Sequence, residues 1–504
     1  MQHTQTNNYE SLYTRVLGIF SQITRIPRAS KHEDAIRRWL MEWSGEQSWK
    51  TAVDDFGNLF IYVPASPGME NSPTLVLQGH MDMVCEKHPE SNHRFDTDPI
   101  PVMTNGEWMT ADGTTLGADN GIAIAIALAV AESPTVKHPP LEICLTVEEE
   151  TGLTGAVNLD AALLSGKILI NLDSEDEGVI TIGCAGGVDS DITLPIARRD
   201  RSTGDTDGEL YLLQIGGLQG GHSGVEIGEI RGNALRLLGR ALQEMSRNEN
   251  SFQLIAVHGG NAHNAIPRDA AALLQITQGY QAAGTMLSGL QEKLRKEYQP
   301  VESGIEMSLL PWDQAPEHIR RTLEEAASRP AMQPESQRKV QCALLAYPHG
   351  VEKYSGSIEG LVETSCNLAT IRTHADHIKL LCSQRSSVVS GLTGITDRIR
   401  AVTELLGADV KNPNSYPPWE PDFSSELLQH ARRVYHERFG KDPVVETIHA
   451  GLECGIIGAK IPGMEMISIG PTIQFPHSPD EQLNLPSLKK TILFVTDLLE
   501  SYAR

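Results

Sequence analysis

Several apolar runs in the first 185 residues end in acidic or imidazole side chains, and this pattern constrains the fold more than any other feature. Residues 141–147 are mainly apolar and lead directly into three carboxylates, Glu148, Glu149 and Glu150. Adjacent anions repel one another, so their place at the end of a buried strand is favourable only where a cation binds. This junction therefore predicts a strand that ends at a cation site.

Two further runs in this part of the chain end in the same kind of side chain. The motif His80-Met81-Asp82 follows the strand-like residues 74–78, and Asp173 follows residues 167–171. Carboxylates and histidines gathered from several strand ends are the ligands that a dinuclear hydrolase site requires. We therefore expect these side chains to share one metal site.

Helix and strand signals alternate along the first 185 residues. Residues 33–43 have the periodicity of an amphipathic helix, residues 58–63 have the pattern of a strand, and residues 121–132 form an Ala-rich helical segment. Alternation of this kind predicts an α/β fold with a mainly parallel sheet. Ligands of such sheets bind at the carboxyl ends of the strands, which is where the acidic clusters lie.

The middle of the chain has a different character, with several short strand-like runs. Its other patterns are helices at residues 233–247 and 282–298, a charged loop at residues 197–209 and a Pro-rich connector at residues 411–422. If the late His477 is a metal ligand, the C-terminal region must return to the first domain, and the middle region is then an insertion. The predicted organisation is a discontinuous catalytic domain, residues 1–187 and 401–504, with an inserted α+β domain, residues 188–400.

Length, charge and cysteine content narrow the class of protein. A chain of 504 residues exceeds a single hydrophobic core, so two or three domains are expected. The formal net charge of −23 argues against a nucleic-acid-binding protein, which needs a basic face. The seven cysteines are scattered without a C-x-x-C pair, and this indicates free thiols in a reducing compartment.

Neither a targeting segment nor a membrane segment is predicted. The first 20 residues contain no continuous apolar stretch, so no signal peptide is expected. Residues 122–130 are apolar but too short to span a bilayer. We therefore expect a cytoplasmic protein with no membrane and no nucleic-acid partner.

The spacing of the histidine and the carboxylate in His80-Met81-Asp82 suggests a division of labour. Two residues apart at a strand end, the two side chains point to the same side. His80 can then ligate a metal, while Asp82 accepts a hydrogen bond from an imidazole and fixes its tautomer. Taken alone the motif is common, and a structural histidine is the plainer interpretation.

Asp119 is a candidate to bridge two metal ions. It lies in Gly117-Ala118-Asp119-Asn120-Gly121, where small neighbours allow the backbone to approach a crowded site. Two metals about 3.5–4 Å apart need a shared carboxylate. A plain helix N-cap is the alternative for Asp119, because it stands at the start of the Ala-rich helix.

The two later glutamates of the triplet are predicted to have different tasks. In an extended segment Glu149 and Glu150 point to different sides, so one can hold a metal while the other faces the attacking water. A solvated acidic loop is the alternative for the whole triplet. Asp173 is the acid closest to its strand and is therefore the better ligand candidate in its segment.

At this point the motifs resemble those of a known family. Their order is H-x-D, G-A-D-N, E-E-x-G, N-x-D, G-G-H-S-G and a late P-H-S-P, and they extend from about residue 74 to residue 484. This order is similar to that of the M20 family of metallopeptidases, and within it to the dipeptidase branch. The family fold is a catalytic α/β domain interrupted by a lid or dimerisation domain, which agrees with the insertion inferred above.

The resemblance implies a specific set of roles at the metal site. His80, Asp119 and Asp173 would hold one Zn²⁺, and Asp119, Glu150 and His477 would hold the other. Glu149 would be the general base, and Asp82 would orient or polarise His80. Zn²⁺ is the implied metal, although a ligand set of this kind also takes Co²⁺ or Mn²⁺.

The resemblance also implies residues that contact the substrate. His222, in the lid motif G-G-H-S-G, would stabilise the oxyanion. Arg385 lies near the position where relatives bind a substrate carboxylate, although Gln384-Arg385-Ser386-Ser387 departs from their arginine-proline context. Asn261 in the lid and Glu453 in the segment His449-Ala-Gly-Leu-Glu453 are further candidates, the latter for the substrate amine.

The predicted function is a dizinc peptidase that hydrolyses dipeptides, with Xaa-His and β-alanyl-His among the candidate substrates. Glu149 would take a proton from the attacking water and return it to the leaving amine. A deacylase or carboxypeptidase for N-acyl amino acids is the alternative enzyme, and a catalytically silent metal-dependent binding protein is the alternative from another class. Both a monomer and a homodimer are compatible with the sequence.

Overall fold

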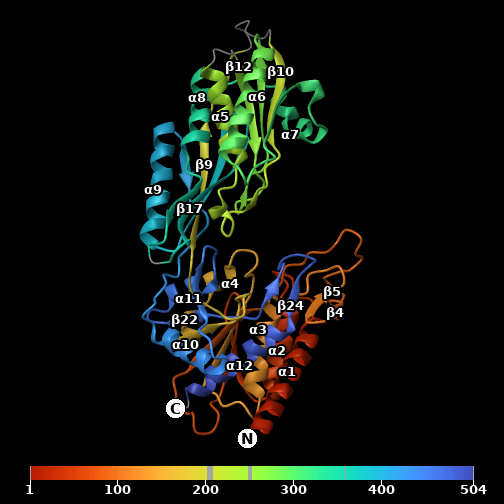
Figure 1. The fold of residues 1–504 in the computed structure, drawn as a ribbon, viewed down its shortest axis with the longest axis vertical. Helices are drawn as coiled ribbons and strands as arrows, with labels where there is room; N and C mark the ends of the chain where they lie inside the picture. The colour runs from red at the N-terminus through yellow and green to blue at the C-terminus, as the bar shows by residue number, and fades with distance from the viewer. Residues whose placement is uncertain (1, 201–207, 248–251, 357, 503–504) are drawn as a thin grey trace. The chain divides into compact units, whose positions relative to one another are not determined.

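A computed structural model gives the fold of residues 2–200, 208–247, 252–356 and 358–502 (Figure 1). Most of the predicted loop at residues 197–209 lies outside these described residues. The chain divides into two compact units, each with its own core. The first unit comprises Met1–Cys184, Trp419–Thr447 and Leu452–Arg504, and the second comprises Ala185–Pro418 and Ile448–Gly451.

The second unit is longer than the predicted insertion of residues 188–400. The chain after residue 400 continues in helix α9, Val389–Leu406, and then in two short strands, β19 and β20, which both pair with β9. Part of the segment predicted as a Pro-rich connector is therefore built into a sheet. Backbone hydrogen bonds to β9 hold it there, and its proline content gave no sign of that pairing.

The first unit is built on an eight-stranded sheet with the strand order β1-β2-β6-β3-β7-β22-β8-β21. The four central strands, β6, β3, β7 and β22, are parallel, whereas β1, β2 and β8 pair antiparallel to their neighbours. The predicted α/β class is confirmed, and the parallel arrangement belongs to the centre of the sheet. The strands are β1 Lys50–Val53, β2 Leu59–Val63, β3 Leu75–His80, β6 Leu141–Thr146, β7 Ile168–Asn171, β8 Val179–Cys184, β21 Val444–Ile448 and β22 Glu465–Ser468.

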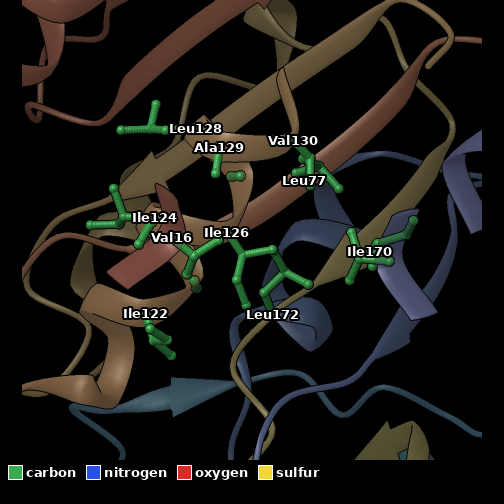
Figure 2. Packing of buried hydrophobic residues seen from close by; sticks show 14 of the residues in the cluster. Val16, Leu77, Ile122, Ile124, Ile126, Leu128, Ala129, Val130, Ile170 and Leu172 are labelled. Atoms are coloured by element: carbon green, nitrogen blue, oxygen red, sulfur yellow. The ribbon is translucent and has the colours of Figure 1, made fainter. Parts of the chain in front are cut away.

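Helix α3, Ala118–Glu132, is the centre of the first core. Its sequence is apolar on every side, so it can be stable only when it is buried all round. It packs between helix α1, Gln2–Ile23, and strand β3. Figure 2 shows side chains of this core, from Val16 of α1 through Ile126 of α3 to Leu77 of β3. The helix therefore fixes its own N-terminus against the strand that ends at His80.

The remaining elements of the first unit complete its layers and add a small sheet. The small sheet has the order β23-β24-β5-β4, and His477 lies between β23 and β24. These elements are α2 Asp34–Glu46, β4 Val102–Asn105, β5 Trp108–Ala111, α4 Thr154–Asn158, the 3₁₀ turn η1 Ala161–Leu163, α10 Glu426–Phe439, α11 Glu453–Lys460, β23 Ile473–Gln474, β24 Gln482–Asn484 and α12 Leu485–Ser501.

The second unit is an α+β structure on a ten-stranded sheet, whose main path is β15-β10-β14-β12-β17-β18-β9-β19. Helices α5, α6, α8 and α9 pack on it to form one core, and α7 packs with β10, β12 and β14 in a smaller cluster. The pairings along this path are antiparallel.

The strands of the second unit are β9 Gly186–Pro195, β10 Glu209–Gly216, β11 Gly221–His222, β12 Phe252–Gly259, β13 Ala265–Ile266, β14 Ala270–Ile276, β15 Glu306–Pro311, β16 Gly350–Tyr354, β17 Val362–Thr373, β18 His377–Ser386, β19 Asp409–Lys411 and β20 Ser415–Tyr416. Its helices besides α9 are α5 Ala234–Arg247, α6 Tyr280–Glu297, α7 Glu317–Ala327 and α8 Pro334–Ala346, with the 3₁₀ turns η3 Ile227–Glu229 and η4 Trp312–Gln314. In the part of the chain that the structure describes, none of the helices combines the length and apolar character that a membrane crossing needs.

Candidate metal centre

The central strands of the first unit bring the predicted ligands to one edge of the sheet. Strand β3 ends at His80, and it lies between β6 and β7, to both of which it is parallel. The glutamate triplet follows β6, and Asp173 follows β7. Parallel strands place their carboxyl ends at the same edge, so side chains that are far apart in sequence meet there.

Asp119 stands between two histidines. Its Oδ1 lies 3.0 Å from Nε2 of His80, and its Oδ2 lies 3.1 Å from Nε2 of His477. His80 Nε2 is also 3.4 Å from Asp173 Oδ1, and His477 Nε2 is 3.0 Å from Glu150 Oε2. One carboxylate therefore faces two donor groups at once, which is the arrangement of a bridging ligand.

The side chains form three overlapping groups that could each hold a metal ion. Within each group the potential ligand atoms lie within 4.8 Å of one another. The groups are His80, Asp119 and Asp173; Asp119, Glu150 and His477; and His80, Glu149 and Glu150.

The donor chemistry of these groups fits a divalent cation. Imidazole nitrogens and carboxylate oxygens are the ligands that Zn²⁺ accepts. In addition, the buried oxygen Glu150 Oε1 has no hydrogen-bond partner among the described residues. A buried carboxylate oxygen that lacks a partner is costly, and a metal ion would remove that cost. The residues present therefore suit the binding of a metal.

The electrostatics of the cluster favour cations. Hydrogen bonds to Asp119 and Glu150 raise the pKa of His477 to about 11. Burial opposes the ionisation of Asp119, but its hydrogen bonds with His477 and His80 prevail and hold its pKa well below the usual range. Burial raises the pKa of Glu149 well above that of an ordinary glutamate. The carboxylates of this buried site therefore stabilise positive charge placed among them.

The segment after β6 differs from the expected extended strand. Glu148 has a left-handed backbone, with φ of 51°, and the chain turns there. Glu149 and Glu150 therefore do not point to opposite sides, and both carboxylates lie in one group with His80. The prediction of alternating sides was wrong because it assumed a regular strand, whereas a turn at Glu148 brings both carboxylates to the same group as His80.

Asp82 holds the turn and the first histidine together. Its Oδ1 is 3.3 Å from Nδ1 of His80, and its carboxylate accepts hydrogen bonds from the backbone amides of Glu149 and Glu150 at 3.1 and 3.2 Å. Ser30 Oγ donates a further bond, at 2.7 Å. Burial opposes the charge of Asp82, yet His80 and these donors keep its pKa below the ordinary value. One buried carboxylate thus orients two parts of the cluster.

Glu453 is fully buried and contacts the strands that end at the cluster. Its Oε2 accepts hydrogen bonds from Gln78 Nε2 at 2.5 Å and from Thr146 Oγ1 at 2.6 Å. Burial raises the pKa of Glu453 to about 8. These contacts favour a role in supporting β3 and β6, and the predicted contact with a substrate amine stays a prediction.

The sequence interpretation missed three buried residues that support the cluster. Arg28, Glu33 and Glu481 are all at least 95% buried, with 2%, 5% and 2% of their surface exposed. Glu33 accepts a hydrogen bond from the backbone amide of Glu148 at 2.9 Å. The only available signal was the position of Glu481 just after Pro-His-Ser-Pro-Asp. Arg28 belongs to no motif, and Glu33 stands at the start of a predicted amphipathic helix, which gave no sign of a contact with the cluster.

The other predicted residues, His222, Arg385 and Asn261, belong to the second unit. The structure groups them with that unit and not with the candidate metal ligands, so their roles stay predictions. His222 accepts hydrogen bonds at Nδ1 from the backbone amides of Gly224 and Val225, each at 3.2 Å. A neutral ring in this state carries its proton on Nε2.

Arg385 is nearly buried, with 7% of its surface exposed. It donates from Nη1 to the hydroxyl of Tyr416 at 3.0 Å, while its Nε has no hydrogen-bond partner among the residues that the structure describes. Among the described residues no carboxylate forms an ion pair with it. Asn261 lines a cavity of about 670 Å³ together with His258, Arg268 and other residues of the second unit.

Comparisons with known proteins identify the family of the chain. Residues 76–501 match Peptidase family M20/M25/M40. The chain is 38% identical over 483 residues to the cytosol non-specific dipeptidase of Escherichia coli, which covers 96% of both chains.

Two solved structures illustrate how far the similarity extends. The aminoacylhistidine dipeptidase from Vibrio alginolyticus is 38% identical, with a TM-score of 0.83 over 97% of this chain and 96% of the other. Aminopeptidase PepT from Bacillus cereus shares the fold at 16% identity, with a TM-score of 0.56 over 98% and 99% of the two chains. The protein therefore belongs to Peptidase family M20/M25/M40 and is a peptide hydrolase.

Proposed function

We propose that the protein is a dinuclear zinc dipeptidase. The observation that supports this most directly is the position of Asp119, whose two carboxylate oxygens face His80 and His477 at 3.0 and 3.1 Å. His80, Asp119 and Asp173 would hold one ion, and Asp119, Glu150 and His477 the other. A bound pair of divalent ions supplies Lewis acidity and lowers the pKa of water at the site. Co²⁺ or Mn²⁺ are compatible with the same ligands.

Glu149 is the proposed general base. It belongs to the group with His80 and Glu150, so it lies within reach of the reacting water without being needed by either proposed triad of ligands. A base that does not ligate the metal is free to take a proton and to return it to the leaving amine. Burial raises the pKa of Glu149, and a carboxyl group with a raised pKa is a better proton carrier near neutral pH.

Residues of the second unit would bind the substrate in this proposal. His222 would donate from Nε2 to the developing oxyanion, because its Nδ1 already accepts two backbone hydrogen bonds. Arg385, nearly buried and without a carboxylate partner among the described residues, would pair with the C-terminal carboxylate of a short peptide. Asn261 is proposed as an additional polar contact.

The names of the relatives support the substrate class. One relative is named a cytosol non-specific dipeptidase and another an aminoacylhistidine dipeptidase, so we propose dipeptides as substrates, with Xaa-His and β-alanyl-His peptides among them. The name of the first relative and the free cysteines support a cytoplasmic location. We further propose that the second unit acts as a lid or dimerisation domain, in a monomer or a homodimer.

The test compares two neighbouring glutamates. We expect Glu149→Gln to lower kcat for a dipeptide by about 100-fold or more while the enzyme retains its metal, because removal of a general base typically costs that much. Glu148→Gln is the matched control, since Glu148 accepts a hydrogen bond from Thr154 and belongs to none of the three ligand groups. Full activity in Glu149→Gln would contradict the assignment of the base.

A second comparison separates the dipeptidase from a deacylase of the same family. The purified, zinc-loaded enzyme is given a dipeptide and the same dipeptide acetylated on its amine. A dipeptidase requires the free amine and cleaves only the first. Faster cleavage of the acetylated form would favour the N-acyl amino acid deacylase or carboxypeptidase.

A further inference from the structure

The backbone that leads into Asp119 is held by one distant carboxylate. Glu481 accepts hydrogen bonds from four consecutive backbone amides. Oε2 receives those of Leu116 and Gly117 at 2.8 and 3.0 Å, and Oε1 receives those of Ala118 and Asp119 at 2.8 and 3.3 Å. The side chain has only 2% of its surface exposed. Both carboxylate oxygens are therefore committed to this one loop.

Arg28 binds the same loop through a backbone carbonyl oxygen. It donates to the carbonyl oxygens of Met81 and Asp82 at 3.0 and 2.6 Å and also to the carbonyl of Gly117. The first two carbonyls belong to the segment after His80, and the third belongs to the loop before Asp119. One guanidinium thus ties together the two segments that carry these metal ligands.

The glycine in this loop fits the same arrangement. Gly117 has a left-handed backbone, with φ of 69°, and a Cβ there would lie 2.6 Å from Nη2 of Arg28. A larger residue would therefore displace the guanidinium as well as strain the backbone. The sequence Gly117-Ala118-Asp119 is thus matched to Arg28 behind it.

A plain helix cap does not account for this arrangement. The helix N-terminus attracts a carboxylate, but a cap ordinarily satisfies one or two amides. Here four amides in a row are bonded, and the last of them belongs to Asp119, whose two oxygens face His80 and His477. Four bonds fix both the position and the tilt of the loop, and an error in either would move Asp119 relative to both histidines.

We propose that Glu481 is a positioning residue for Asp119, with Arg28 as its counterpart on the carbonyl side. The inference rests on the proposed function, in which Asp119 is a ligand shared by two metal ions. Glu481 acts through the backbone of the loop and does not touch the metal. Its contribution is to hold both oxygens of Asp119 at the distances that two cations require.

The decisive variant is Glu481→Gln, which keeps the shape of the side chain. A glutamine turns an NH₂ group toward two of the four amide donors, so half of the hydrogen bonds are lost and the negative charge is removed. We expect the affinity for Zn²⁺, measured by competition with a chromogenic chelator, to fall 10-fold or more. Activity at limiting Zn²⁺ should fall with it, and excess Zn²⁺ should restore part of that activity.

Glu142→Gln, in strand β6 of the first unit, provides a matched control. Glu142 is also buried, with 5% of its surface exposed, and it accepts hydrogen bonds from the backbone amides of Ser165 and Gly166. Glu142→Gln should lower the melting temperature of the protein as much as Glu481→Gln does. The affinity of Glu142→Gln for Zn²⁺ should remain within twofold of the wild type, because the nearest proposed ligand after those amides, Asp173, lies beyond the opposite end of strand β7.

The possible outcomes distinguish a failure of the positioning role from a failure of the proposed metal site. If wild-type protein takes up Zn²⁺ and folded Glu481→Gln binds it equally well, the positioning role is wrong and the proposed metal site stands. If the wild type takes up no Zn²⁺, both fail. Should Glu481→Gln not fold, Glu481→Asp and Arg28→Lys decide in its place, and wild-type affinity in both would overturn the proposal.

Discussion

Carboxylates of the first unit differ in task because they differ in contacts. Asp119 faces two histidines, Asp82 holds a turn, and Glu481 holds a loop. Glu148 is chemically identical to Glu149 and adjacent to it, yet it bonds Thr154 and lies outside the ligand groups. At the scale of the residue, position in the cluster decides whether an acid is a ligand, a base or a support.

The shared position of Asp119 leads to a first prediction. In Asp119→Asn we expect bound Zn²⁺ to fall well below two ions per chain and kcat/KM to fall on the order of 100-fold, because an amide cannot neutralise two cations. Metal content after dialysis and steady-state kinetics measure the two effects. Asp112→Asn, which changes an exposed acid of the same unit, should leave both unchanged. Full metal content in Asp119→Asn would contradict the bridging role.

His349, in the second unit, leads to a prediction of how folding stability depends on pH. Burial, together with the charge of Arg236, lowers the pKa of His349 to about 3, and Asn233 donates to its Nδ1 at 3.1 Å. An unfolded histidine has a pKa of about 6.5. Below that pH His349 binds a proton in the unfolded chain but stays neutral in the folded protein. Folding stability therefore falls as the pH drops from 6.5 toward 3.

Urea denaturation at pH 7 and pH 5 measures this effect. We expect His349 to account for about 1–2 kcal/mol of the stability lost between these two pH values. In His349→Gln the difference between the two pH values should therefore shrink by that amount. His318→Gln, which changes an exposed histidine of the same unit, should leave the difference unchanged. An identical pH dependence in wild type and His349→Gln would contradict the prediction.

At the scale of the element, the contact between β3 and α3 sets the geometry of the site. Gly79 lies between Gln78 and His80 on β3, and a Cβ there would lie 2.3 Å from Asn120 Oδ1 and 3.1 Å from Ala123 Cβ. Asn120 Oδ1 also accepts the backbone amide of His80 at 3.3 Å. The absence of one side chain therefore allows the helix N-terminus and the strand end to meet.

Gly79→Ala tests this close approach. We expect it to destabilise the protein by about 1–3 kcal/mol, because it overpacks a buried contact, and to weaken Zn²⁺ binding by displacing His80. Thermal unfolding with and without Zn²⁺ measures both. Gly18→Ala is the control: a Cβ at this exposed position of α1 meets nothing within 4 Å, so the change should be neutral or stabilising by up to about 1 kcal/mol. Equal behaviour of the two variants would refute the packing argument.

At the scale of the whole molecule, the proposed ligands all lie in one of the two compact units. These ligands are spread along the chain from His80 to His477, yet every one of them belongs to the first unit. Metal that binds only the folded form stabilises by mass action, and about 4 kcal/mol is expected when free metal is 1,000-fold above its dissociation constant. That stabilisation should reach the first unit and not the second.

Differential scanning calorimetry with Zn²⁺ or with chelator tests this expectation. We expect two unfolding transitions, of which Zn²⁺ moves one upward by several degrees and leaves the other in place. The shift should disappear in His80→Ala, which removes a ligand of the first unit. Equal shifts of both transitions would show that the metal does not act on the first unit alone.

The sequence by itself determined the class of the fold and the chemistry of the site. Apolar runs that end in His80, in the glutamate triplet and in Asp173 predict parallel strands with ligands at their carboxyl ends, because that rule is local and needs only strand polarity. The alternation assumed for Glu149 and Glu150 failed, since nothing local announced the left-handed turn at Glu148.

Only the tertiary structure decided which distant residues meet. His477 reaches Asp119 across 358 positions, and Glu481 reaches the loop before Asp119 across more than 360. Buried hydrogen bonds of this kind leave no periodic signal. A single side chain bonds to backbone groups that almost every residue carries, so the sequence does not show which of them it will meet. Periodicity therefore predicts elements, whereas the packing of those elements selects the partners and so the geometry of the site.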